Sequence, residues 1–262
     1  MTVGEGKLAY VYARDGKPLL ATQTLGRVVE CNSFQDARTF LEAAGERGRQ
    51  RAILREGVFA INTALFVVIT EEVVYSGPVL EEEPKKYSGW QEDLLRMGAF
   101  SPVVIGPARG DSPPPPLGST RISKLPELDS DEIGVVSVHD GPTIPSGEII
   151  APEVGSADSS GHNYFQDPQT FLHLGGRRGK QLQVLTDGSF FINRWFATIE
   201  KKPKTLIPIG YVGVIVSYYG KAGQDLTGKS FRYGEQVDPG ERGVWKSALP
   251  PLDQRPDRGT SL

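Results

Sequence analysis

Apolar residues run through three similar stretches of the chain, and each stretch closes on a turn signal. Residues 8–16 and 133–141 both end in Asp-Gly, and residues 212–220 end in Tyr-Gly. Runs of β-branched and aromatic residues that stop at such a turn are typical of strands. The pattern therefore predicts three strands, each at the start of a structural unit.

A short helix with one apolar face is predicted after each of the first two strands. In the first helix, Ser33 and Asp36 predict a capping box, and Gly45 predicts a left-handed end. In the second helix, Asp167 predicts the N-cap, and Pro168 fits the first helical position. The second helix is expected to close at Gly175 and Gly176, and the expected aromatic core consists of Phe34, Phe40, Phe165 and Phe171.

Two more strands are predicted after each helix. Residues 50–54 and 58–62 flank a turn that contains Gly57, and residues 181–185 and 189–193 flank a turn that contains Gly188. A turn glycine between two apolar runs favours direct pairing of those runs in a hairpin.

The helix and the two following strands occur twice at one constant offset. Asn32 corresponds to Asn163 and Asn62 corresponds to Asn193, because 163 − 32 and 193 − 62 both equal 131. The shared motifs are Asn-x-Phe-Gln-Asp, Thr-Phe-Leu, Gly-x-Arg-Gly-x-Gln and Gly-x-Phe-x-Ile-Asn. A register without gaps indicates a duplicated unit. Glycines, aromatic residues and amides that are duplicated together indicate a duplicated shape more than a duplicated catalytic set.

The repeat divides the chain and sets the expected fold class. The predicted parts are a first unit at 1–74, an insertion at 75–131, a second unit at 132–209, the start of a further β domain at 210–247 and a tail at 248–262. We expect a β-rich α+β protein made of two tandem homologous β-α-β-β units plus the start of that third domain. The insertion contains an acidic run at 81–83, a predicted helix at 89–97, a predicted strand at 102–105 and a proline-rich linker at 110–116. The tail has no helical or strand period, and we expect it to be disordered.

Composition narrows the class of function. The chain has 262 residues and a net charge of −3, which disfavours a nucleic-acid-binding protein because phosphate binding needs a basic face. Its one cysteine, Cys31, rules out an intrachain disulfide and is expected to be a small buried residue. No segment reaches the roughly 20 apolar residues of a membrane span, so we expect this chain alone to be soluble.

Histidine and aspartate offer little catalytic chemistry. The histidines His139, His162 and His173 lack metal-ligand spacing, so we expect no metal and no cofactor. His139-Asp140 is the one His-Asp pair, but the other copy keeps the aspartate, as Asp15, and not the histidine. This favours a turn residue over a general base, with a hydrolase as the weaker alternative. We expect no catalytic residues.

The glycine corners at 45–48 and 176–179 suggest a phosphate loop at first sight. Their spacing does not fit one, so a structural corner is favoured. The nearby arginines Arg47, Arg49, Arg51 and Arg55 form a basic cluster that could bind an anion, although a solvated positive face is favoured.

Four residues remain as candidate interaction or ligand contacts: Asn62, Asn193, Arg47 and Arg178. The two asparagines each end a predicted strand. They either form a paired ligand contact or tie the next turn to the backbone, and the second interpretation is favoured. Trp195 follows Asn193 closely and is expected to be partly exposed.

Residues 207–216, followed by Val-Asp-Pro-Gly-Glu-Arg-Gly-Val-Trp at 237–245, resemble the opening of an SPFH (band 7, flotillin-like) domain. The duplicated motifs upstream look like the amino-terminal part of large bacterial flotillin-like proteins, so the resemblance covers about 8–245. It implies a non-enzymatic, membrane-associated scaffold on the cytoplasmic face that forms homo-oligomers.

The family's amino-terminal anchor, its remaining SPFH strands and its coiled coil do not occur in this sequence. We therefore expect a fragment of a larger protein that reaches the membrane through segments absent from this chain. The alternative is a soluble β protein that binds a small ligand in the cleft between the two units.

Overall fold

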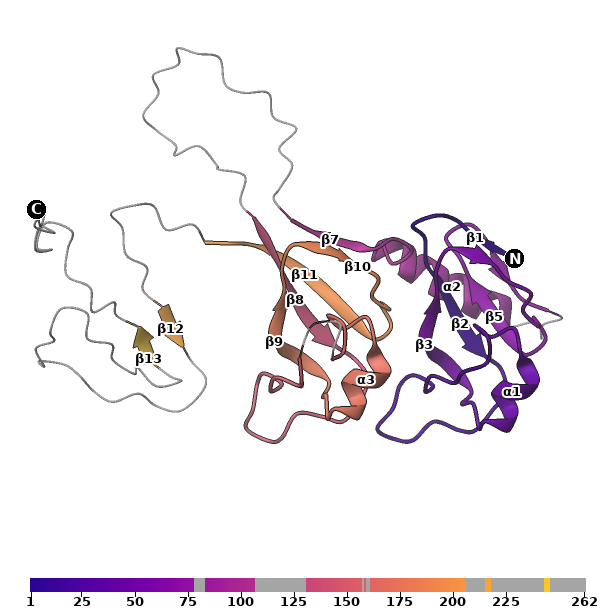
Figure 1. Ribbon diagram of the computed structural model, residues 1–262, viewed down its shortest axis with the longest axis horizontal. Helices are drawn as coiled ribbons and strands as arrows, with labels where there is room; N and C mark the ends of the chain where they lie inside the picture. Colours follow the sequence, from indigo (N-terminus) through magenta and orange to yellow (C-terminus); the bar gives the residue numbers. More distant parts are fainter. Residues whose placement is uncertain are drawn as a thin grey trace, which may run out of the picture. The chain divides into compact units, whose positions relative to one another are not determined.

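The computed structural model describes residues 1–77, 83–106, 131–156, 158, 161–205, 215–217 and 243–245. Two compact parts are distinguished, Met1–Lys204 and Thr205–Leu262. The first part is rich in strands, has few helices and is built from several small antiparallel sheets (Figure 1). Within the described residues, no helix has the length and apolar content that a membrane crossing requires.

The first sheet has the strand order β3-β2-β5-β6. Its strands are β2 (Ala9–Ala13), β3 (Gly48–Leu54), β5 (Phe66–Ile69) and β6 (Val74–Tyr75), and all neighbours are antiparallel. Because side chains alternate along a strand, Val11 faces one side of the sheet and Tyr10 faces the other. Helix α1 (Ala37–Glu42) packs Phe40 on the Val11 side, and helix α2 (Glu83–Arg96) packs Leu94 on the Tyr10 side. Both faces of this sheet are therefore covered.

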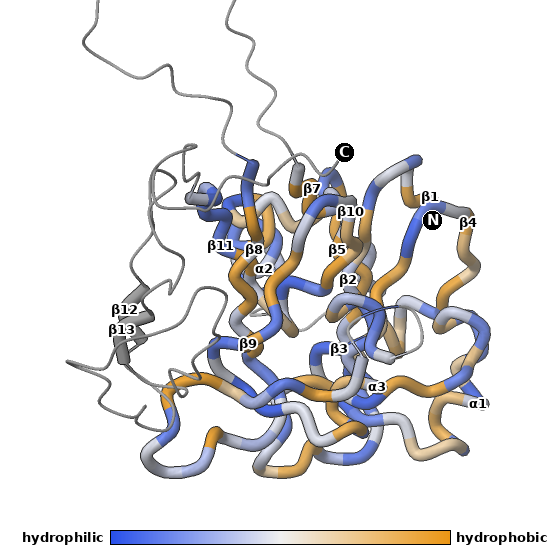
Figure 2. The backbone as a smooth tube through the Cα atoms, turned by 60° about the vertical axis from the view of Figure 1, so that its left-hand side comes forward, coloured by the Kyte–Doolittle hydropathy of each residue, from blue (hydrophilic) through white to orange (hydrophobic). Residues whose placement is uncertain are grey.

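The second sheet has the order β11-β8-β9, also antiparallel. Its strands are β8 (Glu132–Val138), β9 (Gly179–Leu185) and β11 (Ala197–Pro203), and helix α3 (Pro168–His173) precedes β9. In Figure 2, β5 is hydrophobic along its length, whereas β11 becomes hydrophilic after Ile199. This sheet buries one face against Phe165 and Phe171, while its other face is only partly covered.

The predicted hairpins are wrong, because the strands that follow β3 and β9 leave their sheets. β4 (Gly57–Val58) pairs with β1 (Thr2–Val3), and β10 (Gly188–Phe190) pairs with β7 (Val103–Ile105). Gly57 and Gly188 have φ values of 152° and 153°, so the backbone changes direction at these glycines instead of folding back. The pairing of β7 with β10 also ties the insertion to the second half of the chain.

The helix boundaries follow the sequence with three corrections. Asp167 caps α3 as predicted, and Gly175 is left-handed there (φ 94°). In α1 the N-cap is Asp36, which accepts the Thr39 N–H at 2.9 Å, and Ser33 forms no capping box because its φ is 52°. Ala44, not Gly45, is the left-handed residue, and Gly45 is needed because a Cβ there would overlap the Phe40 ring. Helix α2 begins six residues before the predicted start, at Glu83.

The duplicated motifs are explained by local structure. Asn32, Ser33 and Phe34 are all left-handed, as are Asn163, Tyr164 and Phe165, an arrangement that L-residues rarely adopt. Gln35 and Gln166 stabilise these turns, since each donates to the asparagine carbonyl (3.2 Å) and accepts a backbone N–H from the later strand segment, Ala60 at 2.9 Å or Phe191 at 2.8 Å. The glycine corners are tied in the same way by Gln50 and Gln181, whose amides donate to two corner carbonyls each. The interpretation as structural corners is thereby confirmed.

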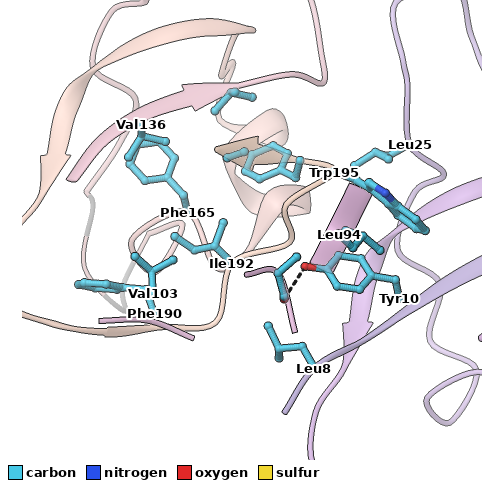
Figure 3. Close-up of a cluster of buried hydrophobic side chains, with 14 of the residues drawn as sticks. Leu8, Tyr10, Leu25, Leu94, Val103, Val136, Phe165, Phe190, Ile192 and Trp195 are labelled. Atoms are coloured by element: carbon cyan, nitrogen blue, oxygen red, sulfur yellow. Dashed lines mark hydrogen bonds between the residues drawn. The ribbon is translucent and has the colours of Figure 1, made fainter. Parts of the chain in front are cut away.

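The main apolar core lies between the two sheets. It joins Tyr10 of the first sheet and the preceding Leu8, Leu94 of α2, and Val136 and Trp195 of the second half (Figure 3). All four expected core phenylalanines are buried, and Cys31 is buried as predicted. Trp195 was expected to be partly exposed and is instead 8% exposed, because it packs edge-on against Tyr10 with 5.0 Å between ring centroids.

The second part, Thr205–Leu262, contains β12 (Ile215–Ser217) and β13 (Gly243–Trp245), which pair antiparallel. The acidic residues at 81 and 82, the proline-rich linker at 110–116 and the tail at 248–262 lie outside the described residues.

Candidate functional site at the junction of the two sheets

Asn193 is the one sequence candidate that forms a hydrogen bond across the junction within the described residues. Its Nδ2 donates to the carbonyls of Gln50 (3.0 Å) and Arg51 (2.9 Å), and its Oδ1 accepts the Trp195 N–H at 2.9 Å. The side chain of the exposed counterpart Asn62 accepts the Ala64 N–H at 3.0 Å and forms no bond across the junction within the described residues. Both asparagines therefore cap the following turn, as the favoured interpretation predicted, and one of them also fastens the second half to strand β3.

A buried ion pair crosses the same junction. Arg51 Nε lies 2.8 Å from Asp140 Oδ2, and the two side chains are 4% and 0% exposed. The other carboxylate oxygen of Asp140 accepts the Thr24 N–H at 2.7 Å and the Thr24 hydroxyl at 3.1 Å. Arg51 also donates to Gln169 at 2.9 Å. Each buried charge thus has a charged partner and further hydrogen bonds, which burial of charge requires.

Two predictions are wrong at this point. Asp140 was expected to serve its own turn, as Asp15 does by accepting the Gly16 N–H at 2.7 Å, yet Asp140 bonds to distant residues. Arg51 was expected on a solvated positive face and is buried. Both predictions failed because corresponding residues of the two copies have different neighbours.

Aromatic rings contact two arginines of the predicted basic cluster, Arg49 and Arg55. The Arg49 guanidinium lies 4.4 Å from the Trp90 ring centroid and 5.1 Å from that of Trp195. The Arg55 guanidinium lies 3.7 Å from the Phe191 ring. Such cation–π contacts contribute about 0.5–2 kcal/mol each, depending on solvent exposure. Apolar and basic side chains together therefore bind the second half to the first.

The other two candidates lie at the glycine corners. Arg178 Nε donates to the Gly141 carbonyl at 2.8 Å, which ties its corner to the end of β8. Arg47 is exposed, and its backbone N–H donates to the Lys17 carbonyl at 2.9 Å. Among the described residues, the side chains of Arg47 and Arg178 form no hydrogen bond with Asn62 or Asn193. The four candidates therefore do not form one site.

An open cavity of about 310 Å³ lies at the junction. Its lining comprises Thr24, Leu25, Arg49, Met97, His139, Arg194, Trp195 and Thr198. His139 Nε2 lies 3.0 Å from the Thr198 hydroxyl oxygen. Burial lowers the pKa of His139, and desolvation likewise lowers the pKa values of Arg49 and Arg194. Among the described residues, the lining carries two arginines and no carboxylate.

The histidines of the described part of the chain lie in separate surroundings. His139 contacts Thr198 whereas Asp140 contacts Arg51 and Thr24, so these neighbours do not act as a His-Asp pair. His162 is buried, and its Nδ1 accepts the Phe165 N–H at 3.0 Å. In the described part of the chain, no three His, Cys, Asp or Glu residues gather as metal ligands would.

Sequence reasoning missed most of this junction. Arg194 and Trp195 line the cavity, and they stand where the first unit has Thr63 and Ala64. The available signal was this difference between two otherwise similar copies. No family model, no curated protein and no solved structure matches the chain.

Proposed function

We propose that the protein is a non-enzymatic interaction module in which duplicated β-α-β-β units pack on one another in one direction and build a larger assembly. The observation that carries this proposal is the asymmetry of the junction. The first sheet contributes one of its faces to the junction, whereas the second half contributes one of its edges. Packing through unlike surfaces leaves one surface of each kind unused, and such contacts can continue from copy to copy.

The used face of the first sheet carries Tyr10, Arg49, Arg51 and Ile53, and we name it the acceptor face. Ala13 pairs with Gly48 and Val138 pairs with Gly179, and these two glycines occupy equivalent positions in the two copies. Ala13 therefore corresponds to Val138, and this correspondence identifies the equivalent face of the second sheet. That second acceptor face carries Val135, Lys180, Leu182 and Val184. Leu182 is 58% exposed and Val184 is 40% exposed. Exposed apolar side chains on a sheet face favour a partner there.

The used edge of the second half consists of Asp140, Gln169, Asn193 and Trp195, and we name it the docking edge. The corresponding residues of the first unit are Asp15, Arg38, Asn62 and Ala64, and all four are exposed. One acceptor face and one docking edge are thus free within the described residues. The partner that fits them is a second copy of this chain, whose first unit would dock on the second sheet.

The wider setting of this module rests on the family resemblance. An SPFH-like, membrane-associated scaffold on the cytoplasmic face would contain such units next to its SPFH domain. The antiparallel pairing of Ile215 with Trp245 supports this proposal, because both residues lie in the two motifs that carry the resemblance.

Sedimentation velocity over a range of concentrations tests the proposed self-association. We expect the unmodified chain and a Leu174→Glu control to associate, and Leu182→Glu to remain monomeric. Leu174 is an exposed leucine of the second half that lies outside the sheet. A wild-type chain that stays monomeric at every concentration would reject the proposal.

A gain-of-function variant tests the geometry as well. Leu182 stands where the first acceptor face has Arg51, so Leu182→Arg would offer an ion-pair partner to Asp15 of a second copy. Association should become tighter, and adding Asp15→Ala should cancel the gain. If Leu182→Arg tightens self-association equally with and without Asp15, two copies do not dock on each other as the two units of one chain do.

A second candidate function is supported by the junction cavity. Its size, its basic lining and its position between the two units fit the binding of a small ligand.

A further inference from the structure

We propose that the junction cavity binds a small ligand through an oxyanion group, a carboxylate or a phosphate, held by Arg194 and Arg49, with the apolar part of the ligand against Trp195. The inference rests on the second candidate function and gives it a ligand class and named residues. It does not depend on self-association.

The strongest indication is positive charge without an anionic partner among the described residues. Arg194 Nε is buried and has no hydrogen-bond partner among the described residues. A buried donor that is left unsatisfied costs free energy, and a charged donor costs more than a neutral one. In the part of the chain that the structure describes, neither Arg194 nor Arg49 forms an ion pair, although the charge of Asp93 partly offsets the desolvation that lowers the pKa of Arg49. The nearby carboxylate of Asp140 is already neutralised by Arg51.

The remaining polar groups of the lining suit an anion. His139 Nε2 lies 3.0 Å from the Thr198 hydroxyl oxygen. When the ring nitrogen donates its hydrogen to that oxygen, the hydroxyl hydrogen stays free for an oxygen atom of the ligand. Guanidinium groups bind carboxylates and phosphates through charge-assisted hydrogen bonds, often two at a time. The lining therefore offers donors and no competing acceptor charge.

The cavity also has an apolar wall, formed by Leu25, Met97 and Trp195. Its volume of about 310 Å³ lies at the lower end of the range that small-molecule sites occupy. A bare ion would leave this wall without a partner, so an organic anion of few carbon atoms fits better than an inorganic one.

This chemistry is specific to the junction and is not inherited from the repeat. Arg194 and Trp195 correspond to Thr63 and Ala64, and Thr198 corresponds to Val67. The first unit keeps the same turn around Asn62 without an arginine or a tryptophan, so the fold of a unit does not require them. Because Arg49 belongs to the first sheet and Arg194 to the second half, a bound ligand would stabilise the packing of the two.

The test measures thermal unfolding and isothermal titration with two probes, inorganic phosphate and citrate, at constant ionic strength. Phosphate and citrate also stabilise proteins by exclusion from the surface, so the comparison between variants is decisive. We expect saturable binding of at least one probe to the unmodified chain, and the probe that binds more tightly identifies a phosphate or a carboxylate ligand.

Arg194→Met should weaken this binding at least about tenfold, because it removes charge-assisted hydrogen bonds to the ligand. Without ligand, Arg194→Met should be at least as stable as the parent chain, since it removes an unpartnered buried donor. The exposed Arg47→Met is the matched control and should bind normally. If Arg194→Met does not fold, Thr198→Val provides the same comparison.

The proposal is overturned if neither probe binds saturably, or if Arg194→Met binds as tightly as the parent chain. Sedimentation of the same samples separates this result from the proposed assembly. A monomeric chain that binds the probe through Arg194 would support this site and reject the scaffold. A chain that self-associates but does not bind the probe would support the scaffold and reject this site.

Discussion

Removing the Asp140 carboxylate should be among the most destabilising single changes at the junction. In Asp140→Ala, Arg51 loses its ion-pair partner while its side chain stays 4% exposed, and Thr24 loses two hydrogen bonds. Among the described residues, Arg51 then keeps Gln169 as its one side-chain partner. Breaking a buried pair on one side typically costs about 3–5 kcal/mol. Urea unfolding followed by tryptophan fluorescence is suitable, because Trp195 packs at the junction.

The control is Asp15→Ala, at the corresponding position of the first unit. Asp15 is exposed and accepts one backbone N–H, so this change should cost about 1 kcal/mol or less. The double variant Arg51→Met with Asp140→Leu should recover much of the loss, since no buried charge then remains without a partner. Equal costs for Asp140→Ala and Asp15→Ala would refute the reasoning that the junction ion pair is a stabilising contact.

Two further substitutions and one chemical probe have defined outcomes. Asn193→Ala should cost about 2–4 kcal/mol in urea unfolding, because two β3 carbonyls lose their donor, whereas Asn62→Ala should cost about 1 kcal/mol or less. Similar costs for the two variants would contradict the assigned role of Asn193. Gly176→Ala should cost about 1–3 kcal/mol, because its Cβ would overlap the buried Phe171 ring, and a neutral result would show that the corner has room. Cys31 is 3% exposed and burial raises the pKa of its thiol, so a thiol reagent at pH 8 should react far more slowly with the native than with the urea-unfolded chain.

The sequence predicted local structure well where one motif determines one turn. Asp167 followed by Pro168 defines the start of α3 with side-chain chemistry alone, and the aromatic residues of each unit are buried as expected. The prediction of hairpins was wrong because a glycine after a strand is compatible with two outcomes. The chain can fold back and pair with the same strand, or it can leave for another sheet. At Gly57 and Gly188 the chain changes sheet, and their strand partners Val3 and Ile105 lie far away in the sequence. Pairing over such separations cannot be deduced from a turn signal.

The junction was harder to predict for a different reason. A duplicated sequence contains two copies of each residue, but an assembly of two units has only one interface. Asp15 and Asp140 are the same residue type at corresponding positions, yet one is exposed and the other is buried against Arg51. The exposure of a residue in such a chain depends on which copy has a neighbour, and a single sequence does not contain that information.

The differences between the copies show how the two acceptor faces diverged. On the first acceptor face, Arg51 forms a buried ion pair with Asp140 of the docking edge, and this pair fixes one orientation of the two units. The second face has Leu182 at that position, so a docking aspartate would lose water there without gaining a cation. In the proposed assembly, contacts on the second face would depend on the exposed Leu182 and Val184 and on Lys180 at its margin. The internal junction contains a buried ion pair, so the proposed association between copies through the second face should be weaker and reversible by comparison.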